Sequence, residues 1–159
     1  MEWFFGFKLH LVINDKGEIM AFKLTQATTD DREPVQSLTK DLIGKLVGER
    51  GYISQKLFDT LFEKGFQLIT KIKKNMKNKL MPLFDKLLLR KRAVIESVND
   101  QLKNISQIEH SRHRSINNFM VNLLSGIAAY TLQPQKTLFK FMLKTTDCLL
   151  KIQCRTDVN

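Results

Sequence analysis

The sequence predicts an α/β fold in which helices flank a mixed β-sheet. Residues 3–13 alternate between apolar and polar side chains, as a strand does, and residues 18–25 repeat the pattern after a turn over residues 14–17. Farther along, short apolar runs alternate with segments of helical periodicity, which gives the order β-β-α-β-α-β-α. We expect His10, within the first alternating run, to be a core or sheet-face histidine.

The first helix is expected directly after the hairpin. Asp30 or Asp31 can cap it, and Pro34 fits its first turn. The side chains expected to face inward are Val35, Leu38, Leu42 and Ile43. Gly44 is expected to end this helix, and residues 45–49 then form a short strand.

A second helix is expected between Ser54, as its N-cap, and Gly65, which closes it. Its inward face consists of apolar residues at helical spacing, namely Leu57, Phe58, Leu61 and Phe62. Residues 66–72 have the composition of a further strand.

Two longer helices complete the pattern. One is expected over residues 81–104 with Pro82 in its first turn. The other starts at Ser115 and has seven apolar residues at core spacing: Ile116, Phe119, Met120, Leu123, Leu124, Ile127 and Ala128.

Composition narrows the choice of partners. The chain has 26 Lys+Arg against 16 Asp+Glu, a net charge of +10, which attracts polyanions such as DNA, RNA or an anionic membrane. Cys148 and Cys154 form no disulfide framework, so a reducing cytoplasm is the simplest compartment. Glu2 and the early alternating run do not have the pattern of a signal peptide, and the apolar helix over 119–132 is too short to span a bilayer, so we expect a soluble protein.

Arg92, Glu96 and Lys103 are the most informative residues. Offsets of four and seven residues return them to nearly one face of a helix, whereas Ile95, Val98, Leu102 and Ile105 fall on the opposite, buried side. One carboxylate between two cations suits a metal-binding acid beside a phosphate backbone. It also suits an ordinary ion-paired helix surface, and the spacing alone leaves both readings open.

The spacing R-x3-E-x6-K of these residues resembles the signature around the last catalytic Glu of DDE-type bacterial insertion-sequence transposases. Similarity to this family covers roughly residues 3–135 and includes the stretches 3–14, 29–34, 51–54, 67–71 and 109–115. Leu89 stands where the family often has Tyr. The resemblance implies an RNase H-like sheet flanked by helices.

The same resemblance implies that the first, central strand of the family's sheet, which carries the first catalytic Asp, is missing. We therefore expect an N-terminally truncated transposase, with a partial catalytic domain over residues 1–135 and a divergent tail over 136–159. Leu149, Leu150 and Ile152 could extend a helix in that tail.

The family's acids bind two Mg²⁺ ions for DNA cleavage and strand transfer. Glu49, within Gly48 to Tyr52, occupies the position of the second Asp, and Glu96 that of the last Glu. The resemblance implies that both acids are catalytic metal ligands and that Arg92 and Lys103 support catalysis. With one acid absent and one altered, we expect this chain alone neither to cut nor to join DNA.

Basic residues are the candidates for DNA contact. They are Lys71, Lys73, Lys74, Lys77 and Lys79, with Arg112 and Arg114 farther along. The expected partners are DNA at insertion-sequence ends and either full-length transposase or a second copy of the chain, but no membrane. The alternatives are a non-catalytic fragment that inhibits transposition by binding DNA or transposase, and a fragment that does not fold stably.

Overall fold

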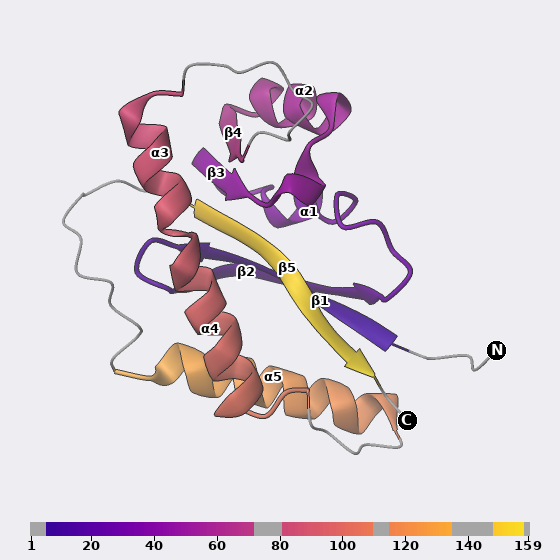
Figure 1. Ribbon diagram of the computed structural model, residues 1–159. Coiled ribbons are helices and arrows are strands. Elements are labelled where there is room, and N and C mark those ends of the chain that lie inside the picture. Colours follow the sequence, from indigo (N-terminus) through magenta and orange to yellow (C-terminus); the bar gives the residue numbers. More distant parts are fainter. Residues whose placement is uncertain (1–5, 72–80, 110–114, 135–147, 158–159) are drawn as a thin grey trace.

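The computed structural model describes residues 6–71, 81–109 and 115–134, together with the backbone of residues 148–157. In these residues a five-stranded sheet has the order β2-β1-β5-β3-β4, with helices on both faces (Figure 1). The strands are β1 (Gly6–Asn14), β2 (Ile19–Gln26), β3 (Gly44–Gly48), β4 (Phe66–Thr70) and β5 (Cys148–Asp157). The helices are α1 (Val35–Leu38), α2 (Gln55–Glu63), α3 (Leu83–Arg90), α4 (Arg92–Asn104) and α5 (Ile116–Leu132), with a 3-10 turn at Arg50–Tyr52.

The predicted N-terminal hairpin is confirmed, since β1 and β2 pair antiparallel. Its turn is closed by the Asn14 side-chain oxygen, which accepts hydrogen bonds from the backbone N–H groups of Lys16 and Glu18 at 3.0 and 2.9 Å. Gly17 follows with φ +80°, a backbone conformation that favours glycine. The Tyr130 hydroxyl of α5 donates to the Gly17 carbonyl at 2.7 Å, which ties the turn to the last long helix.

The central position of the sheet is occupied by β5. This strand runs antiparallel to β1 and parallel to β3, so it joins the hairpin to the β3–β4 pair (Figure 1). The expectation of a helix at Leu149, Leu150 and Ile152 was wrong, because these residues lie in β5. The central strand that we expected to be missing thus has a counterpart from the C-terminal end of the chain.

Alternation along the strands divides the core into two layers. Leu9, Leu11 and Ile13 of β1 pack with α3, α4 and α5, whereas Val12 faces α1 and α2. The strands β3 and β4 divide in the same way: Val47 and Ile69 belong to the first layer, and Leu46 and Phe66 to the second. The described chain is therefore a mixed sheet between two helical layers, as predicted.

The first two helices bury less than expected. The first, α1, has only four residues; Ile43 is 78% exposed, and Gly44 begins β3 instead of ending the helix. In α2 the N-cap at Ser54 and the closing Gly65 are confirmed, but Phe62 is 68% exposed. Phe58 is exposed as well, and its ring stacks on that of Phe62, so the predicted four-residue inward face was half wrong.

The predicted helix over 81–104 is two helices, α3 and α4, which meet at Lys91. Ile95, Val98 and Leu102 are buried as predicted, but Ile105 is exposed. In α5 the buried side is formed by Phe119, Leu123, Gly126, Ile127 and Tyr130. Ile116, Leu124 and Ala128 are exposed, contrary to prediction. None of the helices in the described residues is both long and apolar enough to cross a membrane.

Candidate active site

Glu49 follows directly after the last residue of β3. The chain turns there into a single 3-10 turn, in which the Tyr52 N–H donates to the Glu49 carbonyl at 3.1 Å. Tyr52 is buried and folds back onto Gly48, where an added Cβ would lie only 3.3 Å from the Tyr52 ring. The glycine and the tyrosine thus fix a tight turn that leaves Glu49 at the strand end, half-buried.

Glu96 comes to the same place from α4. The buried face of this helix, formed by Ile95, Val98 and Leu102, packs on the sheet, so the opposite face with Arg92 and Glu96 is accessible to solvent. The predicted segregation of the apolar and charged faces of this helix is therefore confirmed at these positions.

Arg92 joins the two acids. Its Nη2 atom lies 3.0 Å from Oε1 of Glu96 and 3.5 Å from Oε1 of Glu49, so two carboxylate oxygens face one guanidinium nitrogen. The structure therefore brings together three of the four residues predicted for the acidic site. Glu49 lies at a strand end, whereas Arg92 and Glu96 lie on a helix that begins 43 residues later in the sequence. The fold therefore brings them together.

Lys103, the fourth residue, lies farther along α4. Seven residues separate it from Glu96, which corresponds to about 10 Å along a helix. Its Nζ atom forms an ion pair with Glu109 at 2.5 Å, in the segment after the helix. Sequence reasoning missed this partner, because Glu109 follows an irregular stretch in which Gln107 has φ +49°.

Asp85 is a further acid that sequence reasoning did not consider. Its side chain is 5% exposed and pairs with Lys45 Nζ at 2.7 Å, and the same ammonium lies 4.7 Å from the centre of the Phe84 ring. Lys45 lies near the start of β3 and Glu49 just past its end, which corresponds to about 13 Å along a strand. Asp85 is therefore an ion-paired anchor of α3 and not a third member of the acidic site.

Asp30 and Asp31 do not join the site. The carboxylate of Asp30 accepts hydrogen bonds from Arg32, whose side chain holds the Asp30 pKa below its usual range. Asp31 pairs with Lys8 at 2.9 Å. Neither caps α1, whose N-cap is Pro34 without a side-chain hydrogen bond, so that prediction was wrong.

Glu49 and Glu96 are the two carboxylates that approach each other around Arg92. Mg²⁺ is commonly held by one or two carboxylates and keeps several of its waters. Glu49 and Glu96 face a common cation, Arg92, and remain accessible to solvent. Within the described residues no group of three or more Asp, Glu, His or Cys side chains could hold a metal ion, so a two-ion site is not complete there.

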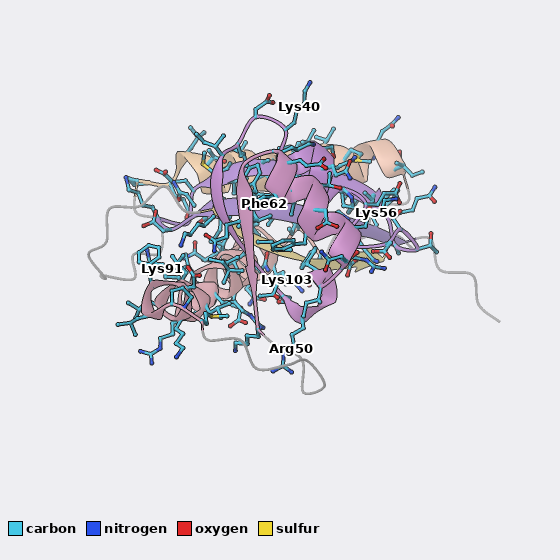
Figure 2. All side chains as sticks on the ribbon, turned by 90° about the horizontal axis from the view of Figure 1, so that it is seen from above. Lys40, Arg50, Lys56, Phe62, Lys91 and Lys103 are labelled. Carbon is cyan, nitrogen blue, oxygen red and sulfur yellow. The ribbon has the colours of Figure 1, made fainter. Side chains whose placement is uncertain are left out.

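The basic candidates fall largely outside the described residues. Lys73, Lys74, Lys77, Lys79, Arg112 and Arg114 all do so. Lys71 is described and lies exposed directly after β4. Elsewhere, Lys40 and Arg50 extend from opposite edges of the molecule in Figure 2, so these exposed cations do not share one face.

A mixed sheet between two helical layers, with an acid at a strand end facing an acid on a helix, defines an RNase H-like domain of the class that the sequence resembles. Residues 1–116 match the family model described as transposase DDE domain. The chain belongs to this family, and its role is therefore in DNA transposition. No curated protein and no solved structure gives a significant match. Domains of the family generally use a divalent metal ion, and the family implies DNA as a partner.

Proposed function

We propose that Glu49 and Glu96 hold one Mg²⁺ ion at a DNA end of an insertion sequence, and that this chain alone does not cleave or join DNA. The observation that supports the proposal is the convergence of both carboxylates on Arg92, at 3.5 and 3.0 Å. A cation already lies between them in the folded chain, which is the charge arrangement that a metal ion requires.

The chain's own residues would bind and orient the DNA. Glu49 and Glu96 provide the carboxylate oxygens, while Arg92 and Lys103, on the same helix, would turn from their ion pairs with acidic side chains to backbone phosphates. A bound divalent ion would polarise a phosphoryl oxygen and lower the pKa of a water molecule.

Two features of the acids support inactivity. The described residues offer no third carboxylate near Glu49 and Glu96. Glu49 also has one methylene more than the Asp that the family motif has at this position. A misplacement of about 1 Å at a reacting centre can cost on the order of 10²-fold in rate.

The proposal is tested in two parts. Purified chain is incubated with supercoiled DNA and Mg²⁺ or Mn²⁺, and no nicking above background is expected. Nicking that disappears in the Glu96→Gln variant would disprove the claim of inactivity. Mn²⁺ binding is then measured by electron paramagnetic resonance in wild type, Glu49→Gln and Glu96→Gln. Both variants should bind Mn²⁺ weakly, whereas Glu63→Gln, at the exposed end of α2, should bind like wild type.

A second candidate is a non-catalytic role, in which the chain binds DNA or transposase and inhibits transposition. The net charge of +10 favours it. DNA affinity should then fall steeply as salt is raised, because each neutralised phosphate releases condensed counterions. The chain should also lower transposition by active full-length transposase in the same reaction. Salt-independent DNA binding, together with unchanged transposition, would exclude this role.

A further inference from the structure

Arg92 occupies the position between the two carboxylates in the folded chain. We propose that Arg92 exchanges between the acid pair and a DNA phosphate, so that a divalent ion and DNA each strengthen the binding of the other. The proposal rests on the metal site proposed above and adds to it a coupling between its two ligands.

Arg92 and a bound ion would compete for the same two carboxylates. One atom, Nη2, lies 3.0 Å from the Glu96 carboxylate and 3.5 Å from that of Glu49. An ion held by both carboxylates would lie within about 5 Å of this positively charged nitrogen. Two positive charges this close repel each other, so Arg92 must leave before an ion is held by both acids.

Arg92 can leave the two carboxylates in only one way. A guanidinium does not deprotonate in proteins, so the charge cannot be removed and the side chain must move. The Arg92 side chain is 35% exposed, and its partners Glu49 and Glu96 are 32% and 49% exposed. Ion pairs with this much exposure are weak, which keeps the cost of release low.

A phosphate is a suitable new partner for the released side chain. Guanidinium groups bind phosphate through two parallel N–H···O bonds, and the charged face of α4 is accessible to solvent. DNA that draws Arg92 away removes this competing cation from Glu49 and Glu96 and so favours a metal ion there. By linkage, a metal ion that displaces Arg92 raises the affinity for DNA by the same factor.

Arg90 provides a matched control. It is an exposed residue near Arg92, at the end of α3, and forms no ion pair with the described residues. Replacing either arginine with Gln removes one positive charge, at positions two residues apart in the chain. An effect of overall charge therefore appears in both variants, whereas displacement from the acid pair appears only in Arg92→Gln.

The test measures Mn²⁺ binding by electron paramagnetic resonance, with and without a short DNA duplex at fixed salt, after subtraction of Mn²⁺ bound by DNA alone. Without DNA, Arg92→Gln should bind Mn²⁺ about three- to tenfold more tightly than wild type, and Arg90→Gln within about twofold. Adding DNA should tighten Mn²⁺ binding in wild type and Arg90→Gln but not in Arg92→Gln. Arg92→Lys, which keeps the charge but loses the planar fork, should lie between wild type and Arg92→Gln.

The outcomes separate the coupling from the metal site. If Arg92→Gln and Arg92→Lys bind Mn²⁺ no more tightly than wild type, while Glu96→Gln loses binding, the coupling is wrong and the metal site stands. If Glu49→Gln and Glu96→Gln bind Mn²⁺ as wild type does, the metal site itself is wrong and the coupling falls with it. Circular dichroism melts establish that each variant is folded.

Discussion

The two faces of the sheet differ in how completely helices cover them. On one face α3, α4 and α5 bury a continuous apolar cluster, and the hairpin turn is tied to them through Tyr130 and Lys91. On the other face α1 and α2 cover a smaller cluster and leave Phe58 and Phe62 exposed. Arg92 and Glu96 lie on a helix of the well-covered face. The comparison indicates that the acid pair depends on the packing that fixes α4 against the sheet.

The largest expected effect is that of Phe119→Ala on the well-covered face. Phe119 is fully buried, and its ring stacks on that of Phe7 with centroids 5.4 Å apart. Truncation removes this contact and leaves a cavity, so the free energy of unfolding should fall by about 3–5 kcal/mol. Urea denaturation measures the change. A loss below about 1 kcal/mol would show that this face is not the better-packed one.

The second effect concerns His10, whose side chain lies on the opposite face, beside Thr25 at 2.7 Å. Burial lowers the pKa of His10 from 6.5 to about 4. Because the unfolded chain then binds more protons than the folded chain between these values, stability falls as pH falls through this window. The His10 contribution to this loss between pH 7 and pH 5 should be about 2 kcal/mol.

Thermal and urea denaturation at a series of pH values measure this dependence. The His10→Gln variant is the control, since it keeps a polar side chain but does not titrate. Its stability should change less over the same pH range than that of wild type. Parallel pH profiles for the two proteins would contradict the assignment to His10.

A smaller effect is expected for Tyr130→Phe, which removes only the hydroxyl that donates to the Gly17 carbonyl. The free energy of unfolding should fall by about 1–2 kcal/mol, because the buried Gly17 carbonyl loses its partner. Thr131→Val is the comparison: Thr131 is exposed and its hydroxyl bonds only within α5, to the Ile127 carbonyl. Equal losses in the two variants would show that the hairpin turn is not anchored by Tyr130.

The smallest effect is expected for Phe62→Ala on the less covered face. This ring is 68% exposed and stacks on Phe58 with centroids 6.2 Å apart. Truncation should change the free energy of unfolding by about 0.5 kcal/mol or less. The same substitution at Phe119 and at Phe62 therefore measures the difference between the two faces directly. Similar losses of stability in Phe119→Ala and Phe62→Ala would show that helices cover the two faces of the sheet equally well.

Much of the fold could be predicted because its signals are local. The hairpin over β1 and β2, the strands β3 and β4, and the end of α2 at Gly65 follow from alternation, turn residues and glycine. Helical periodicity, in contrast, does not show how much sheet is available to cover a helix. That is why Ile43, Phe58 and Phe62 were expected inside and are exposed.

The central strand β5 could not be predicted from local patterns. Its partner β1 lies at the opposite end of the sequence, with Gly6 aligned to Asp157 and Asn14 to Cys148. A pairing of such large sequence separation leaves no mark in the periodicity of either segment. The break between α3 and α4 was missed as well, because the apolar spacing continues across Lys91.

For the site, spacing was informative within α4 but not beyond it. The offset of four residues predicted that Arg92 and Glu96 share a face, and their 3.0 Å ion pair agrees. The approach of Glu49 was expected only through resemblance to the family, since β3 and α4 are far apart in sequence. No sequence signal indicated that Lys45 pairs with Asp85 or that Lys103 pairs with Glu109, because each of these ion pairs joins different segments of the chain.

The central claim is that Glu49 and Glu96 together form a site for one divalent ion. Diffraction from crystals soaked in Mn²⁺, with the anomalous signal recorded, tests it most directly. We predict a single anomalous peak between the two carboxylates, with the Arg92 guanidinium turned away from them. Anomalous density elsewhere, or none at the carboxylates while Arg92 still bridges them, would contradict the claim.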